Sequence, residues 1–306
     1  MTIRCLGSVL ADLDGLNGCV VVVDNASGDG SADRIEAWIE EQEEATPVRL
    51  IRSPRNTGFS GGHNLGMAAS EGDFYLVLNS DAEVRPGFFP ALLAATETSP
   101  EAGLFAPCIE RKDGSIQDSC FRFPTPASEF IRGACSGPIT RVLRRWDLSL
   151  GPHPADAEIR WASFASILLR GSMVRELGPM DEGYFMYFED IDYCREARRA
   201  GWRIRHVPEA RVLHLQGGSG PVKELSKARK RMPAYFYASR SRFFYRAYGW
   251  HGLVAANLAW NAGRLVAQTR RLLGKQVNSA VEAESRDIWI NAARPLGPRY
   301  APGEVR

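Results

Sequence analysis

Residues 19–31 read CVVVVDNASGDGS, a β-branched apolar run that gives way at once to a polar, turn-rich segment. Such a run, bounded by turn residues, is typical of a strand buried inside an α/β sheet. Residues 32–43 then show helical periodicity, so the pair predicts a strand and its crossover helix. Because ligands of open α/β sheets bind beyond the carboxyl ends of the strands, the polar residues from Asp24 onward are candidate ligand contacts.

The same strand and helix unit recurs along the chain. Its alternation predicts an α/β fold with an open, mostly parallel sheet flanked by helices. The segment 111–154 is rich in Pro, Gly and Arg, and we expect an irregular surface excursion there. Further strands are expected at 48–52, 74–78, 104–109, 159–170, 202–207 and 210–213, and further helices at 62–70, 90–98, 188–200 and 252–273.

Composition excludes several classes of protein. The 306 residues are 44% hydrophobic and 24% charged, which supports a large core and argues against intrinsic disorder. Six cysteines without a CxxC pair indicate buried thiols in a reducing compartment rather than a disulfide scaffold. No apolar run reaches the ~20 residues needed to cross a bilayer, and the first residues make a poor signal peptide. We therefore expect a cytoplasmic protein.

Charge is distributed unevenly between two predicted domains, 1–220 and 221–306. Residues 221–275 contain 12 basic residues and one acid, a net charge of +11, whereas the whole chain carries +2 and the remainder therefore −9. This asymmetry predicts a polyanionic partner for the basic helical C-terminal extension. Nucleic acid is not expected, because no recognisable nucleic-acid-binding module accompanies the charge.

The predicted helix 252–273 supports two interpretations of that basic extension. Val254, Leu258, Leu265 and Leu272 fall close to one helical stripe, with basic residues nearby. An apolar stripe beside basic side chains is typical of contact with an anionic membrane surface. The alternative is an ordinary basic face on a helix that belongs to the core.

Asn79-Ser80-Asp81 directly follows the apolar run 74–78. A carboxylate at a strand end, beside a short polar neighbour, can bind a hard divalent cation through oxygen. Such a cation bridges a diphosphate and offsets the charge that develops on it as it leaves. The alternative is a plain turn, since Asn, Ser and Asp are frequent where strands end.

Two polar segments are candidates for binding a nucleotide. Asp24-Asn25-Ala26-Ser27 offers short acceptors for a nucleobase N–H or a ribose hydroxyl, with a turn and helix cap as the alternative. The glycine-dense loop 56–66 opens a helix, and free N–H groups at a helix start favour anions. It lacks the GK[ST] of a P-loop, and its alternative is a flexible connection.

Two further motifs carry titratable groups. The segment 185–194 (FMYFEDIDYC) places three carboxylates behind an aromatic run, where mutual repulsion and lost hydration raise proton affinity and favour a general base. An acidic first helical turn is the alternative. His214 follows a short apolar run and precedes a glycine turn. Its imidazole can bind a divalent metal, although a lone histidine is more often structural.

Taken together and in order, these segments resemble family 2 glycosyltransferases with the GT-A fold. The nearest group is similar to the rhamnosyltransferase-like enzymes of bacterial cell-surface polysaccharide assembly. The resemblance extends over about two-thirds of the chain, from residue 19 to residue 220. The matching strings are VVVVDNASGDGS, RNTGFSGGHNLGMA, LVLNSDAEV, GYFMYFEDIDYCREARRAGW and HLQGGS.

The resemblance implies a role for each matched position. Asp190 would be the catalytic base, and Asp81 and His214 would hold Mg²⁺ or Mn²⁺ against the diphosphate. Asn79 stands where many members have the first Asp of the metal motif. Trp161 and Glu189 are expected on the acceptor side. The implied donor contacts are Asp24, Asn25, Ser27, Asn56, Gly58, Phe59, Asn64, Asn79 and Ser80.

The chain departs from the family pattern in two places. Members usually begin with another strand that helps to enclose the nucleobase, whereas residues 1–11 already resemble the helix that follows that strand, so the first strand is expected to be missing. The segment before the base often contains a glycine where this chain has Phe164, which is expected to narrow the pocket for the acceptor or the donor sugar.

The resemblance implies an inverting transferase. The expected donor is a dTDP, UDP or GDP sugar, with rhamnose as the candidate sugar. The expected acceptor is a hydroxyl of a cell-surface polysaccharide or of a lipid-linked glycan, at the inner membrane face. The alternative is a catalytically silent subunit that binds a nucleotide sugar or a glycan, because the strand enclosing the nucleobase is missing.

Overall fold

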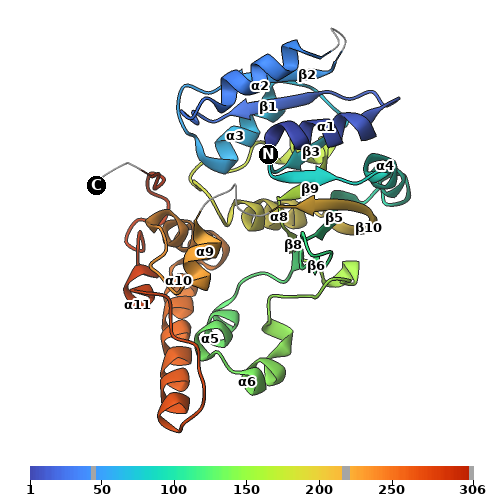
Figure 1. Ribbon diagram of the computed structural model, residues 1–306. Helices are drawn as coiled ribbons and strands as arrows, with labels where there is room; N and C mark the ends of the chain where they lie inside the picture. The colour runs from blue at the N-terminus through green and yellow to red at the C-terminus, as the bar shows by residue number, and fades with distance from the viewer. Residues whose placement is uncertain (43–45, 216–220, 303–306) are drawn as a thin grey trace.

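The computed structural model describes residues 1–42, 46–215 and 221–302. It arranges them in three tiers: a small sheet with its helices, a larger central sheet, and a helical lobe at the other end (Figure 1). The strands are β1 (Val20–Asp24), β2 (Val48–Arg52), β3 (Phe74–Leu78), β4 (Ala82–Val84), β5 (Ala102–Glu110), β6 (Ile116–Gln117), β7 (Cys120–Phe121), β8 (Trp161–Ala162), β9 (Ser166–Arg170) and β10 (Arg203–His214).

Helices flank both sheets and build the lobe, as the resemblance implies for an α/β protein (Figure 1). None of the helices in the described ranges is long and apolar enough to span a membrane. They are α1 (Thr2–Leu13), α2 (Ser31–Glu40), α3 (Gly58–Ala68), α4 (Phe88–Thr98), α5 (Pro126–Ala134), α6 (Gly137–Val142), α7 (Gly171–Leu177), α8 (Glu189–Arg199), α9 (Val222–Lys227), α10 (Ala234–Leu272) and α11 (Glu284–Asp287).

The central sheet is mixed, which corrects the expectation of mostly parallel strands. Its order is β3-β9-β5-β10-β4, with β6 added to β5. Parallel pairing joins β5 to β10, and β1 to β2 in the small sheet. β9 runs antiparallel to both β3 and β5, because the long excursion after β5 returns the chain at the end where β5 left it. The two short strands expected at 202–207 and 210–213 form one strand, β10.

The small sheet and the central sheet do not join within the described residues. In the described part of the chain, β1 pairs only with β2, and β3 pairs only with β9. Helix α1 precedes β1, as residues 1–11 predict, and its Asp12 carboxylate accepts the backbone N–H of Phe89 at the start of α4. The strand that the family pattern places first is therefore not among these elements.

The predicted irregular excursion contains two helices, α5 and α6. A capping box begins α5, because the Thr125 hydroxyl accepts the N–H of Ser128 and the Ser128 hydroxyl accepts the N–H of Thr125. Pro126 occupies the first helical position, where its missing N–H has no cost. The Pro, Gly and Arg content of this segment predicted an irregular structure, although its cap residues indicate the start of a helix.

Helix α10 consists of two segments joined at Gly249, whose φ of 66° and ψ of −169° interrupt the helical backbone. The first segment lies against the loop before α8, where Arg242 forms a two-pronged ion pair with Asp181. Arg246 pairs with Asp192 of α8 at 2.7 Å. The second segment packs along α5, so α5 belongs with the C-terminal helices (Figure 1).

A buried ion network joins α5 to α10 and to the tail. The Arg240 side chain is only 2% exposed and donates to Glu129 at 2.8 Å and to Asn257 at 2.6 Å. Burial alone would raise the pKa of Glu129, but the charges of Arg132 and Arg240 lower it to about 2. A buried ion of this kind is tolerated only when its partners remain in place, so the network fixes the register of α5 on α10.

Two glycines allow α5 and α10 to touch backbone to backbone. A Cβ added to Gly263 would lie 2.3 Å from the carbonyl oxygen of Phe130, and one added to Gly133 would lie 2.3 Å from that of Trp260. Neither contact can relax by moving a flexible side chain, because both involve main-chain atoms. The helix spacing therefore depends on the missing side chains.

We expect Gly263→Ala to destabilise the protein by about 1–3 kcal/mol, since overpacking at a rigid contact outweighs the higher helix propensity of alanine. Gly7→Ala is the matched control, because Gly7 lies inside α1 with nothing within 4 Å of an added Cβ. The control should be neutral or more stable than wild type. Urea unfolding measures both variants, and a Gly263→Ala protein as stable as Gly7→Ala would contradict the close contact.

Candidate active site

Asp81 and His214 meet because β4 and β10 pair. His214 lies opposite Ala82 in the antiparallel ladder, and the backbone N–H of Leu215 donates to the carbonyl of Asp81 at 2.8 Å. This register brings the Asp81 Oδ1 and His214 Nε2 atoms to 3.2 Å, with both side chains almost fully buried. The Asn79 amide nitrogen lies 3.4 Å from the same ring nitrogen. The glycine turn predicted after His214 lies outside the described residues.

The Asp81 and His214 pair fits a divalent cation. Two ligands bound at ~2.1 Å in neighbouring octahedral positions lie about 3 Å apart. The 3.2 Å spacing of Asp81 Oδ1 and His214 Nε2 matches such an arrangement. No group of three or more His, Cys, Asp or Glu side chains suited to a metal occurs in the described residues. A cation at this pair would therefore need further ligands beyond these two side chains.

Asp190 lies in the first turn of α8, directly after Glu189. Its Oδ1 atom accepts the N–H of Ile191 at 2.9 Å. Burial raises the pKa of Asp190 to about 6, while the N–H groups of Ile191 and Phe164 act in the opposite direction. Burial, and then the charge of Asp190, raise the pKa of Glu189 well above its usual value. The Asp190 carboxylate is therefore a stronger base than an exposed one and remains ionised near neutral pH.

A chain of contacts places Asp190 in the same region as the Asp81 and His214 pair. The Phe164 N–H interacts with the Asp190 carboxylate, and the next carbonyl, that of Ala165, accepts the N–H of Asn79 at 2.9 Å. Asn79 in turn contacts His214. The ends of β3, β9 and β10 thus gather the three predicted groups, although more than a hundred residues separate Asp81 from the other two.

Several predicted donor contacts also hold the site together. The Asn25 side chain accepts from the N–H and hydroxyl of Thr57 and donates to the carbonyl of Gly58. The Asn64 amide exchanges hydrogen bonds with the backbone of Met180, 116 residues away. These amides fix the glycine-dense loop against β1 and against the loop before α8, so their positions matter even without a ligand.

The remaining predicted contacts differ in exposure and bonding. Asp24 ends β1, and its carboxylate accepts the Ser27 N–H at a long 3.4 Å, so little of its bonding capacity is used within the turn. Ser27 and Ser80 are exposed. The Asn56 side chain accepts the Gly58 N–H at 3.0 Å, and the Phe59 N–H donates to the carbonyl of Phe185.

On the acceptor side, Trp161 already has internal partners. Its indole N–H donates to the carbonyl of Arg122 at 2.9 Å. Its ring stacks on Phe121 with centroids 4.4 Å apart. Trp161 therefore anchors the excursion beside Asp190's helix through contacts that need no acceptor, whereas Glu189 is buried directly beside the base.

Two residues before α8 have unusual backbone geometry. Tyr187 and Phe188 both have φ near 70°, a left-handed conformation that costs a residue with a Cβ roughly 1–2 kcal/mol. Aromatic side chains of α10 pack against this strained turn: Tyr235 stacks on Tyr187, and Phe236 and Phe243 contact Phe188. The C-terminal helix thereby helps to hold the turn that presents Asp190.

Two basic residues of the C-terminal region, Lys223 and Arg299, belong to none of the motifs recognised in the sequence. Burial lowers the pKa of Lys223 in α9, and the charge of Asp81 acts in the opposite direction, so the Lys223 ammonium interacts electrostatically with Asp81. Arg299 donates to the backbone carbonyls of Thr57 and Asn56 at 3.0 and 3.5 Å. The concentration of positive charge at residues 221–275 includes Lys223 but not Arg299, and neither residue belongs to a recognisable motif.

The fold and this constellation define a glycosyltransferase of the GT-A class. A mannosyltransferase from Pyrobaculum calidifontis, solved in complex with GDP-Man and Mn²⁺, superposes with a TM-score of 0.52 at 13% identity. The superposition covers 84% of this chain and 67% of that protein. At such low identity the likeness concerns the fold alone.

Sequence relatives identify the family. Residues 1–124 match glycosyl transferase family 2. The N-acetylglucosaminyl-diphospho-decaprenol L-rhamnosyltransferase of Mycobacterium tuberculosis is 32% identical over 251 residues, covering 74% of this chain and 77% of the relative. Rhamnosyltransferase WbbL of Escherichia coli K12 is 25% identical over 203 residues, covering 63% and 67%. The chain belongs to glycosyltransferase family 2, and it is an enzyme of that family.

Gly58→Ala tests the close packing of the glycine-dense loop. Gly58 has a φ of +75°, and an added Cβ would lie 2.2 Å from the carbonyl oxygen of Phe185. We expect the variant to lose several degrees of thermal stability and to bind nucleotide more weakly. Gly66→Ala in the same helix is the control, since its Cβ would make an ordinary 3.5 Å contact with Val23. Equal melting temperatures for the two variants would show that the loop is not held as described.

Proposed function

We propose that this enzyme is an inverting rhamnosyltransferase. It transfers the sugar of a nucleoside-diphosphate donor to a hydroxyl of a lipid-linked or growing cell-surface glycan, at the cytoplasmic face of a membrane. Two relatives with matching length are named as rhamnosyltransferases, and one of those names specifies a diphospho-decaprenol acceptor. The observation that carries the proposal is the Asp190 carboxylate, with its raised pKa, in the same region as the paired Asp81 and His214.

The base in this proposal is Asp190. It removes the proton of the acceptor hydroxyl as the oxygen attacks the anomeric carbon from the face opposite the nucleotide. A new glycosidic bond forms while the bond to the diphosphate breaks, so the configuration at the anomeric carbon inverts. The raised pKa of Asp190 strengthens it as a base, and Glu189 beside it lines the acceptor approach.

The donor in this proposal lies between β1 and the Asp81 and His214 pair. Asp24 and Ser27 contact the nucleobase or ribose, and the N–H groups at the start of α3 face the diphosphate. Asp81 and His214 would hold a divalent cation, Mg²⁺ or Mn²⁺, which would supply positive charge against the departing diphosphate. Lys223 and Arg299 add positive charge on the same side.

We expect Asp190→Asn to reduce transfer by about 10²–10⁴-fold while nucleotide affinity stays unchanged, because the amide cannot accept the proton. In the wild type, kcat/KM should fall about tenfold per unit below about pH 6 and level off above it, since the base must be ionised. Glu196→Gln, later on α8, is the control and should keep wild-type rates. Transfer at the wild-type rate by Asp190→Asn would remove Asp190 from the mechanism, and a wild type inactive with every nucleotide sugar would favour a binding-only function.

Asp81→Asn should weaken nucleoside-diphosphate binding in the presence of Mn²⁺ and leave the weaker metal-free binding nearly unchanged. The amide keeps the size of the side chain and removes the negative charge that a cation requires. Titration calorimetry with dTDP, UDP and GDP measures the effect in the presence of Mn²⁺, Mg²⁺ or a chelator. The same titrations identify the preferred nucleobase of the donor. An Asp81→Asn protein with full Mn²⁺-dependent affinity would refute the metal assignment.

A further inference from the structure

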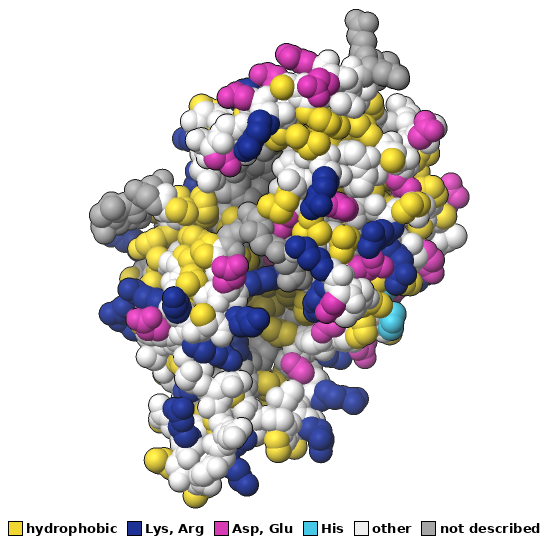
Figure 2. Space-filling view, viewed as in Figure 1, with side chains coloured by type: hydrophobic (Ala, Val, Ile, Leu, Met, Phe, Trp, Pro, Cys, Tyr) yellow, Lys and Arg dark blue, Asp and Glu magenta, His cyan; other side chains and the backbone are white. Residues whose placement is uncertain are grey.

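One end of the molecule is rich in basic residues. Residues 137–146 and 249–275 contain seven Lys or Arg and no Asp or Glu. The two segments meet where the Arg270 guanidinium donates to the carbonyl of Cys135, just before α6 begins. We call this surface the basic end, and Figure 2 shows that basic side chains outnumber acidic ones over the lower half of the molecule. Its basic residues are Arg141, Arg144, Arg145, Arg264, Arg270, Arg271 and Lys275.

An apolar stripe runs along α10 to the basic end. Val254, Leu258, Leu265 and Leu272 lie within about 40° of one another around the helix, given 100° per residue. Leu258, Leu265 and Leu272 are 58%, 65% and 88% exposed. The opposite side of α10 supplies the buried Gly263 and Ala267 that face α5, so the leucine stripe contributes nothing to the core.

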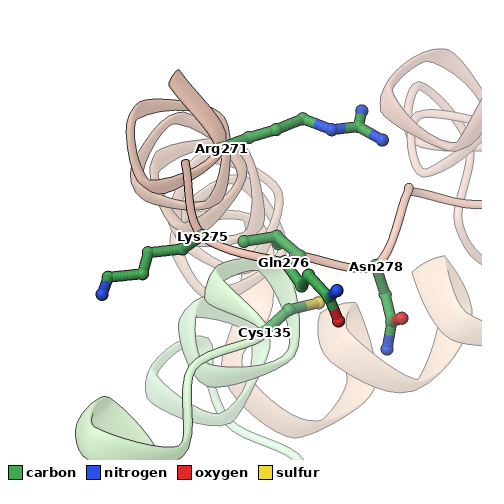
Figure 3. A pocket seen from close by; sticks show the side chains of 6 residues that line it. Cys135, Arg271, Lys275, Gln276 and Asn278 are labelled. Atoms are coloured by element: carbon green, nitrogen blue, oxygen red, sulfur yellow. The ribbon is translucent and has the colours of Figure 1, made fainter. Parts of the chain in front are cut away.

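Exposed apolar side chains continue beyond the stripe. Leu273 is 73% exposed, and Val142 at the end of α6 is 82% exposed. The same end has a recess of about 520 Å³, with the Arg271 and Lys275 side chains extending from it (Figure 3). It is lined by Cys135, Arg271, Lys275, Gln276, Val277 and Asn278. The basic end therefore presents apolar side chains, cations and a polar recess together, as a lipid headgroup region requires.

We propose that the basic end binds the surface of an anionic lipid bilayer, with the leucine stripe entering the headgroup region. Seven cations concentrated at one end attract anionic headgroups, and exposed leucines gain by leaving water. A second copy of the chain is a poorer occupant, because two basic ends would repel each other. Membrane binding would bring the enzyme to the lipid-linked acceptor of the proposed function. The binding itself does not depend on catalysis.

Helix α10 links this surface to the catalytic region. Its first segment holds the loop before Asp190 through Arg242 and Asp181, and its second segment extends roughly 35 Å beyond the Gly249 kink. A bilayer bound along the second segment would thus be connected to the Asp190 region through α10, whose two segments join at Gly249. The geometry suits attachment to a membrane surface rather than insertion across it.

Flotation of the full-length protein with phosphatidylglycerol vesicles tests the proposal, without donor or acceptor. We expect binding at 50 mM salt, at least a tenfold loss at 500 mM salt, and little binding to phosphatidylcholine vesicles. Arg141→Gln, Arg144→Gln and Arg145→Gln together should weaken binding roughly 100-fold. Leu258→Asn, Leu265→Asn and Leu272→Asn together should also abolish flotation. All six side chains are exposed, so these changes leave the core intact.

Arg34→Gln, Arg175→Gln and Arg199→Gln together form the matched control, since these arginines are exposed and lie in the catalytic domain. This variant should float like the wild type. Equal loss in the control, or failure of the wild type to bind anionic vesicles at low salt, would overturn the proposal. Sedimentation showing a dimer that the leucine changes dissolve would instead assign the stripe to a second copy. Transfer to a water-soluble acceptor reports on the proposed function separately.

Discussion

The pairing of β4 with β10 is the constraint on which the catalytic region depends. β4 is only three residues long, yet its antiparallel register with β10 sets Ala82 opposite His214 and thereby brings Asp81 to the imidazole. A shift of one residue in this ladder would turn His214 to the other face of the sheet. The pair therefore needs the hydrophobic sheet core behind it, where Val84 and Val212 are buried side by side in register.

Sequence patterns predicted the strands and helices that carry the site better than they predicted how these elements pack together. Strand β3 and the polar residues after it could be predicted because an apolar run ends abruptly at Asn79. The antiparallel direction of β9 could not be predicted from the sequence. It depends on the end of the sheet to which the long connection returns the chain. The excursion was expected to be irregular although Thr125, Pro126 and Ser128 are a recognisable helix start. Lys223 and Arg299 could not be foreseen, since tertiary packing alone places them near the site.

The C-terminal helices are part of the catalytic architecture as well as an extension of it. The predicted division at residue 220 remains a prediction, but α5 from the earlier segment packs on α10, and the buried Arg240 and Glu129 pair joins them. The same α10 supplies the aromatic rings that cover the strained turn at Tyr187 and Phe188. Strain of this kind persists only where surrounding contacts enforce it, so the position of Asp190 depends on residues far along the chain.

The glycine contact between α5 and α10 has a consequence for how such enzymes can be recombined. Gly133 of α5 and Gly263 of α10 face each other where the two helices cross. A side chain on either glycine would clash with the backbone of the other helix. A chimera that exchanged the C-terminal helices of two relatives at a junction near residue 220 would separate this matched pair. Functional hybrids would have to inherit residues 126–134 from the same parent as α10, so the two stretches form one unit of inheritance despite the hundred residues between them.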